Sequence, residues 1–443
     1  MNKIKHASAA GTFYPNNKED ILKLISSYKV PKSTYNSRAI IVPHAGYKYS
    51  GELAFKGYSY LDKNIKNIFI FAPAHYERIY GCVLSDYEEW ETPLGNIKTN
   101  TLFAKELLNY CESQINNTVF EKEHSIEVQL PFIKYLFPQA KIIPVLYGCE
   151  NFTNISETIS HFYKDKNNGF IISSDLSHFY PEREALKIDN YTAKLIEENS
   201  TQNFDIEQAC GAVGICGIIN FAKNKNYSLI RIDLTNSSKA SGDSSRVVGY
   251  GSWFLYEGDT NKYLKEYFSE FIIDTCRDSI RSGLQLGDFT PREYPCVFNE
   301  QGASFVTLKI DNHLRGCIGS IIAHRAVIKD IMHNAHAAAF SDPRFEKLTL
   351  EEFDKIQITV SLLSKPRHIE FCSEDELLDK LEPYTDGLII RDGNFQGVFL
   401  PDVWEQLPDK ANFLKQLKIK AGLPPNYLSN NLEAFKFQSI KIE

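Results

Sequence analysis

Four short, continuously apolar runs limit what this chain can fold into. They read RAIIV, KNIFIFA, KIIPVLYG and GFIISS, and they lie at residues 38–42, 66–72, 141–148 and 169–174. Strands without polar alternation are typical of sheets that are covered on both faces. Helix-like stretches lie between the runs, for example TLFAKELLNYCESQ and IEVQLPFIKYLF. Alternating strands and helices predict an α/β fold with a sheet that is at least partly parallel.

The pattern changes after the polar stretch YEGDTNKY at residues 256–263. A helix-like segment follows, and then strand-like segments such as ASFVTLKI and KIQITVSLL, mixed less regularly with helices. A chain of 443 residues is long enough for two or three domains. We therefore expect a first α/β domain at residues 1–258 and a smaller α+β domain at residues 259–443.

Charge and cysteine usage exclude several classes of protein. The net charge is −7, so the basic footprint of a nucleic-acid-binding protein is missing and nucleic acid is not an expected partner. No run approaches the roughly 18 apolar residues of a membrane helix, and the N-terminus lacks the apolar stretch of a secretory signal. The nine cysteines are scattered, which argues against a disulfide framework. We expect a cytoplasmic protein.

Polar residues follow the apolar runs where each strand is predicted to end. The set includes two residues at the start of a probable helix, EHSIEVQLPF, and comprises His44, His75, His124, Glu127, Asp175 and His178. Ligands of open α/β sheets collect at the carboxyl ends of the strands, so these side chains can converge there. Each histidine could instead only cap its loop through hydrogen bonds.

Converging histidines and a carboxylate suit a transition metal. Neutral imidazole is a good ligand for iron, copper and zinc, and two histidines with one anion are typical of non-haem Fe(II) oxygenases. From the residues alone, the third ligand is open among Asp175, Glu127 and a cysteine.

A series of motifs resembles the Memo family. ASAAGTFYP, VPHAGYKYSG, PAHY, EHSIEVQLPF, SSDLSHF and ACGAVGI occur in the family's order over residues 5–256. The fold of that family is similar to the class III extradiol ring-cleaving dioxygenases, or LigB-like enzymes, which bind Fe(II) with two histidines and a glutamate. The resemblance therefore implies a LigB-like sheet with helices on both faces.

The resemblance also implies a set of metal ligands, because a cysteine replaces the glutamate in the Memo family. Carried onto this chain, the ligands are His44, His75 and Cys210. Fe(II) is the expected ion, with copper and zinc as alternatives, since a thiolate is softer than a carboxylate. Metal affinity should fall on acidification, because the thiolate and the neutral imidazoles are the binding forms.

Other matched positions are expected around the metal. His178 is the candidate acid/base and Asp175 orients a ligand or the substrate, while His124 and Glu127 support the ligands from outside. The chain departs from the family at two places. It has CGAVGI where the family often has CGRGPI, so a basic side chain is lost, and it has Phe13 where the family usually has tryptophan, so an N–H donor is lost.

The second domain resembles the AMMECR-type domain. LRGCIG, AAFSDPRF, GVFLPDVW and KAGLPPNY match in order within residues 262–443. The expected pocket contains Arg315, Cys317, Asp342 and Arg344. Arg315 could bind a carboxylate or phosphate, or form a structural ion pair. Cys317 could be a nucleophile or an inert cysteine, and Asp342 and Arg344 could form a turn or line the same pocket.

The two resemblances together indicate a fusion. Memo-like and AMMECR-like proteins belong to the AmmeMemoRadiSam system, so a radical SAM protein is the expected partner. We expect an iron-dependent, oxidoreductase-like protein that acts on an unidentified small molecule. A non-catalytic scaffold for the radical SAM partner and a metal-dependent hydrolase are the alternatives.

Overall fold

The computed structural model describes residues 3–30, 35–110, 113–148, 151–286, 293–429 and 431–443. It divides into two compact units, Met1–Thr260 and Asn261–Glu443, which are described separately below. The sequence placed this division after residue 258.

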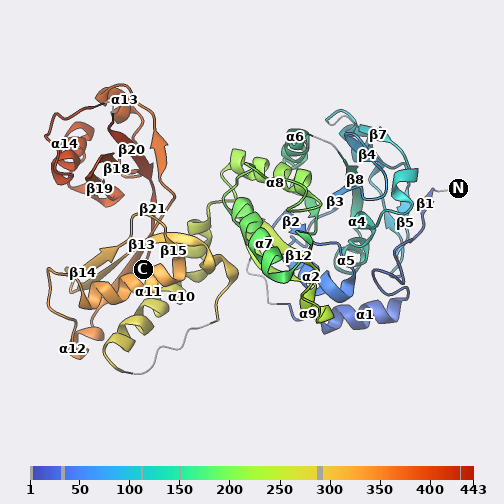
Figure 1. The fold of residues 1–443 in the computed structure, drawn as a ribbon, viewed down its shortest axis with the longest axis horizontal. Helices are drawn as coiled ribbons and strands as arrows, with labels where there is room; N and C mark the ends of the chain where they lie inside the picture. The colour runs from blue at the N-terminus through green and yellow to red at the C-terminus, as the bar shows by residue number, and fades with distance from the viewer. Residues whose placement is uncertain (1–2, 31–34, 111–112, 149–150, 287–292, 430) are drawn as a thin grey trace. The chain divides into compact units, whose positions relative to one another are not determined.

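The predicted strands form the centre of a nine-stranded sheet in the first unit (Figure 1). Strands β2 (Ala39–Val42), β9 (Asn168–Ser173), β3 (Asn67–Pro73) and β8 (Lys141–Tyr147) lie side by side and parallel. The outer strands are β4 (Cys82–Leu84), β7 (Ser113–Ile115), β10 (His178–Tyr180), β11 (Ser228–Asn236) and β12 (Val247–Tyr256). The α/β prediction is confirmed, with β12 and β4 added antiparallel to the parallel centre.

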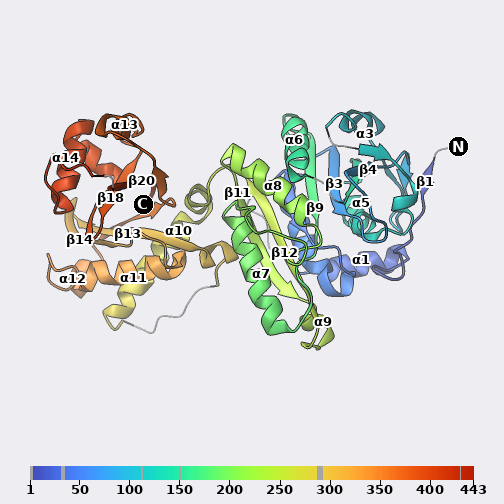
Figure 2. The same ribbon diagram turned by 45° about the horizontal axis from the view of Figure 1, so that its top comes forward.

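Helices cover both faces of this sheet because its strands are apolar on both sides. Side chains such as Ile41, Phe69 and Phe71 pack into one core with helices from one face. These helices are α3 (Thr101–Leu107), α6 (Phe152–Phe162), α7 (Glu182–Glu197) and α8 (Ala212–Lys225), and Figure 2 shows α7 beside β11 and β12. Ile40 and Ile68 alternate with these residues and are equally buried. The further helices are α2 (Glu52–Tyr58), α4 (His124–Glu127) and α5 (Leu130–Leu136), of which α2 and α4 contact β2 and β3.

The N-terminal segment joins a small sheet of its own. Strand β1 (Ile4–Lys5) pairs with β5 (Glu89–Trp90), which pairs with β6 (Ile97–Lys98). Helix α1 (Lys18–Ser27) follows, and the side chain of Asn17 accepts a hydrogen bond from the backbone N–H of Asp20 at its start. The short elements η1 (Tyr47–Gly51), η2 (Thr118–Phe120) and α9 (Ser238–Ser241) complete the unit.

The second unit contains two antiparallel sheets. The first has the order β14 (His313–Gly319), β13 (Gln301–Ile310), β16 (Gln357–Leu363) and β21 (Ser439–Ile442), with β15 (Arg325–Ala326) beside β13. Helix α11 (Val327–Phe340) runs along β13 and β14 (Figure 2). Helix α10 (Thr260–Gly283) is kinked at Phe268, and the short helices are η3 (Cys296–Asn299) and α12 (Leu350–Phe353).

The other sheet of this unit has the order β17 (Arg367–Ile369), β20 (Glu433–Phe437), β18 (Gly387–Asp392) and β19 (Phe395–Phe399). It shares a core with α13 (Glu374–Asp379), η4 (Pro401–Glu405) and α14 (Lys410–Lys420). Ala303, Leu363, Ile389 and Phe437 form a small apolar cluster that joins the two sheets. Over the described residues, no helix combines the length and the apolar character that crossing a membrane requires.

Candidate metal centre

His44 lies just beyond the end of β2 and is held in one orientation. Its Nδ1 lies 2.9 Å from the Ser173 hydroxyl oxygen. That hydroxyl donates to the Ser125 carbonyl at 2.7 Å and accepts from the Gln129 side-chain amide at 2.9 Å. Because the Ser173 proton is already used, His44 must donate its Nδ1–H, and its Nε2 keeps the lone pair that a metal needs.

His75 follows β3 and is oriented by a carboxylate. Its Nδ1 lies 3.0 Å from Glu123, which also accepts the His75 backbone N–H at 2.6 Å. Burial alone would raise the pKa of Glu123, but the His75 ring and backbone, with the Ser125 N–H, lower it to about 2. A carboxylate on the far nitrogen of a histidine is the usual support of a metal ligand, and it leaves Nε2 of His75 available.

The structure adds His124 to these two histidines. Ligand atoms of His44, His75 and His124 all lie within 4.8 Å of one another, so the three could hold a metal ion. The His75 and His124 rings stack with centroids 4.8 Å apart. Burial lowers the pKa of His124 to about 4, which keeps the imidazole neutral at pH 7. Its Nδ1 is buried without a hydrogen bond among the described residues. The strand-end pattern placed His124 in the converging set, whereas the family resemblance gave it a supporting position.

Cys210 approaches the same centre from the loop before α8. Its sulfur lies 3.4 Å from His44 Nε2. Ligands at about 2.0–2.1 Å (nitrogen) and about 2.3 Å (sulfur) on one tetrahedral ion are roughly 3.5 Å apart, so this pair fits a shared ion. Burial, and then the charge of Asp175, raise the pKa of the Cys210 thiol, so metal binding would release its proton. Cys210 as a ligand stays a prediction.

Asp175 and His178 lie on the segment that follows β9. One Asp175 oxygen accepts the backbone N–H of His44 at 2.8 Å, which fixes the loop that carries His44. Burial raises the pKa of Asp175 to about 7. Burial, and to a lesser degree the charge of His75, lower the pKa of His178 against the opposing effect of the Leu176 carbonyl. A neutral His178 can accept a proton, and its catalytic role stays a prediction.

Glu127 is connected to the histidine cluster through the N-terminal segment. Its buried carboxylate pairs with Lys5 at 3.0 Å and accepts hydrogen bonds from the backbones of Ser8 and Ala9 and the hydroxyl of Tyr14. This segment carries Phe13, whose ring stacks on His124 with centroids 4.4 Å apart. The sequence grouped Phe13 and Glu127 with the site, and the structure connects them by this route.

Sequence reasoning missed three residues that orient the ligands: Glu123, Gln129 and Ser173. Glu123 and Gln129 both lie in the segment EHSIEVQ, where the polar residues recur among apolar ones that enter the core. A buried polar residue must find a hydrogen-bond partner. The polar positions of this segment were therefore the sequence signal from which Glu123 and Gln129 could have been found.

Replacing Glu123 with glutamine is expected to weaken metal binding by about 10–100-fold, because the His75 ring loses its anionic acceptor. Competition with a chelator of known affinity measures the change. The matched control is Glu121→Gln, an exposed carboxylate two residues away. Equal affinity in wild type and Glu123→Gln would contradict this role.

Three of the four residues predicted for the second domain's pocket, Arg315, Asp342 and Arg344, belong to two separate ion pairs. Arg315 binds Glu352 through two hydrogen bonds of 2.8 and 2.9 Å, as the structural alternative for Arg315 expected. Asp342 pairs with Arg344 at 2.7 Å and accepts the Cys317 backbone N–H at 2.8 Å. Arg344 also donates to the Cys317 carbonyl at 3.2 Å. Cys317, Asp342 and Arg344 therefore lie together, and a pocket role for the four residues stays a prediction.

The Arg315–Glu352 pair predicts a pH effect. The hydrogen bonds from Arg315 lower the pKa of Glu352 to about 2. A carboxyl whose pKa is lower in the folded state stabilises the fold at pH values above its unfolded-state pKa of roughly 4.3. This contribution to stability is lost as the pH falls toward 2. Glu352→Gln should therefore cost about 1 kcal/mol at pH 7 and flatten the acid dependence of unfolding. Urea titrations from pH 7 to 2 test this, with exposed Glu351→Gln as the control; an unchanged acid dependence in Glu352→Gln would contradict it.

Comparisons with known proteins agree with this division of the chain. Residues 5–254 match the family described as Memo-like protein, and residues 273–442 match AMMECR1. A MEMO1 family protein of Aquifex aeolicus is 31% identical, over 57% of this chain and 100% of the relative. One from Methanobrevibacter smithii is 32% identical, over 56% of this chain and 98% of the relative.

A solved structure, described as uncharacterized protein PH0010 from Pyrococcus horikoshii, is 32% identical. The matched region covers 39% of this chain and 89% of the solved chain, with a TM-score of 0.37. The family match spans more than half of the 443 residues and includes all three histidines of the cluster. The chain belongs to the Memo-like protein family and carries an AMMECR1 domain after its Memo-like domain.

Proposed function

We propose that the first domain is a non-haem, iron-dependent, oxidoreductase-like protein that acts on a small molecule. His44, His75 and Cys210 are the proposed ligands, and His124 flanks them. The observation that carries the proposal is the pairing of His44 Nε2 with the Cys210 sulfur at 3.4 Å, while hydrogen bonds engage the opposite nitrogens of His44 and His75.

The surrounding residues support this chemistry. Iron bound with open positions would supply a site for a small molecule and for O₂. His178, kept neutral by burial, accepts a proton from the bound molecule. Asp175 holds the His44 loop, and the Phe13 ring closes the side of the centre next to His124.

Metal analysis of protein purified without oxygen tests the proposal. The wild type is expected to hold one iron per chain, and Cys210→Ser is expected to lose most of it. Cys216→Ser is the matched control, because Cys216 is a buried cysteine on α8 only six residues away. Absence of metal from every wild-type preparation, or full iron retention in Cys210→Ser, would contradict the proposed centre.

The open positions have their own test, which needs no substrate. Nitric oxide, an analogue of O₂, should bind the iron-loaded wild type and give a high-spin electron paramagnetic resonance signal. Iron that binds stoichiometrically but gives no signal with nitric oxide would contradict the oxidoreductase function and leave a closed structural metal.

We also propose that a radical SAM protein of the AmmeMemoRadiSam system binds this chain. The AMMECR1 match after the Memo-like match supports it, since fusion holds two components at high effective concentration near a third. Calorimetric titration with the purified radical SAM protein tests it, and no binding at micromolar concentrations would contradict it.

A further inference from the structure

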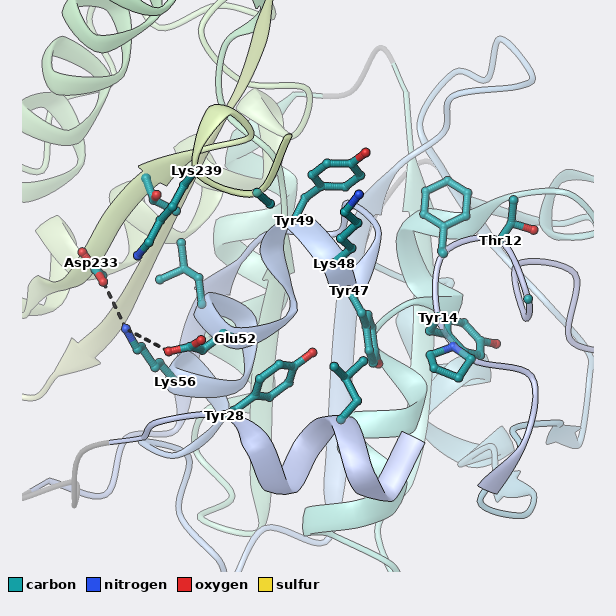
Figure 3. A pocket seen from close by; sticks show the side chains of 17 residues that line it. Thr12, Tyr14, Tyr28, Tyr47, Lys48, Tyr49, Glu52, Lys56, Asp233 and Lys239 are labelled. Carbon is teal, nitrogen blue, oxygen red and sulfur yellow. Dashed lines mark hydrogen bonds and ion pairs between the residues drawn. The ribbon is translucent and has the colours of Figure 1, made fainter. Parts of the chain in front are cut away.

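A cavity of ≈ 660 Å³ lies in the first unit, and Figure 3 shows the side chains that line it. Its walls come from residues 11–15, the end of α1, η1, α2, β11 and α9, and none of the three clustered histidines lines it. Phe13 belongs to both places, because it lines the cavity and stacks on His124. Clefts of about 300–1,000 Å³ are typical of small-molecule sites.

The charges along this cavity do not cancel. Lys56 pairs with Asp233 at 3.2 Å and with Glu52 at 3.8 Å, so it engages both carboxylates of the lining (Figure 3). Lys48 and Lys239 also line the cavity, and neither forms an ion pair in the described part of the chain. Lys48 instead lies over the Tyr49 ring, 5.5 Å from its centroid. The lining therefore carries three lysines against two carboxylates, an excess of one positive charge, in a chain whose net charge is −7.

Aromatic rings supply much of the remaining wall. Besides Phe13, they are Tyr14, Tyr28, Tyr47 and Tyr49. The hydroxyls of Tyr14 and Tyr47 are engaged by Glu127 and the Val128 carbonyl. The Tyr28 hydroxyl is buried and has no hydrogen-bond partner among the described residues, and Figure 3 shows its ring projecting into the cavity.

We propose that this cavity is a binding site for a small organic anion that carries a flat ring. The anionic group, a carboxylate or a phosphate, is attracted by Lys48 and Lys239. The ring packs against the tyrosines and Phe13, where flat faces gain contact at low entropic cost. The site is separate from the metal centre and binds its ligand without metal.

Indole-3-acetate and its neutral amide, indole-3-acetamide, form a pair of probes that differ in charge but share the ring. Calorimetric titration of the full chain is expected to show the acid binding at least about tenfold more tightly than the amide. The double variant Lys48→Gln, Lys239→Gln should weaken binding of the acid by about tenfold and leave the amide unchanged. Exposed Lys187→Ala, on α7 and outside the cavity lining, is the control.

Treating the wild type with a chelator separates this site from the proposed metal centre. Binding of the acid is expected to survive the removal of metal. Loss of binding after chelation would assign the acid to the histidine cluster and overturn the proposal. Equal binding of acid and amide, or unchanged binding of the acid in the double lysine variant, would also overturn it. None of these results depends on whether the metal centre is catalytic.

Discussion

Replacing Glu127 with alanine is expected to lower the free energy of unfolding of the first domain by about 3–5 kcal/mol. Glu127 and its partner Lys5 are both buried, with side chains only 1% and 4% exposed. The variant would leave the Lys5 ammonium buried without its counter-charge. It would also remove the acceptor of two backbone N–H groups and the Tyr14 hydroxyl, so the segment that carries Phe13 would detach.

Urea unfolding followed by tryptophan fluorescence measures this effect, since Trp90 and Trp253 are buried in the first domain. Glu91→Ala is the matched control. Glu91 accepts hydrogen bonds from His6 and Ala7 in the same segment, but it is largely exposed, so its loss should cost less than about 1 kcal/mol. Equal losses in the two variants would show that the Glu127 network does not anchor the N-terminus.

Replacing His75 with alanine is expected to abolish stoichiometric metal binding. His75 belongs to the three-histidine cluster and to the proposed set with Cys210, so it is needed whichever residue is the third ligand. A two-ligand remnant binds first-row metals too weakly to survive gel filtration, and we expect a loss of at least about 100-fold. Elemental analysis after gel filtration measures it.

The control for this variant is His161→Ala. His161 is a partly exposed histidine that hydrogen-bonds Glu106 on the same domain, away from the cluster. His124→Ala and Cys210→Ser, measured in parallel, rank the two candidates for the third ligand. Retention of full metal content in His75→Ala would rule out a site built on this cluster.

The central strands could be predicted because a run such as AIIV has no polar face to leave in water, which requires cover on both sides. The same logic selected the polar residues that follow these strands, and the structure brings His44 and His75 close together. His124 was in the predicted converging set, but its closeness to His75 could not be predicted, because α4 and the end of β3 are brought together only by the tertiary fold. Glu123 was missed because a carboxylate gives no sign in the sequence of which imidazole it will bind.

The second domain was less predictable for a similar reason. Its division into two sheets depends on pairings between distant segments, such as β16 with β21 and β18 with β20. Arg315 and Glu352 lie 37 residues apart, so their bidentate pair could not be read from LRGCIG alone. Local sequence fixes turns and strand periodicity, whereas long-range partners depend on the whole topology.

The hydrogen bonds at Cys317 affect whether a strand of another chain can pair with this sheet. Among the described residues, β14 is the last strand of its sheet. An unpaired outer strand is a template for another chain. Asp342 and Arg344 occupy the outward N–H and carbonyl of Cys317, so an incoming peptide cannot continue the ladder there. At this residue the motif SDPRF blocks the pairing of another strand, which is a role for Asp342 and Arg344 that does not depend on any catalysis in this domain.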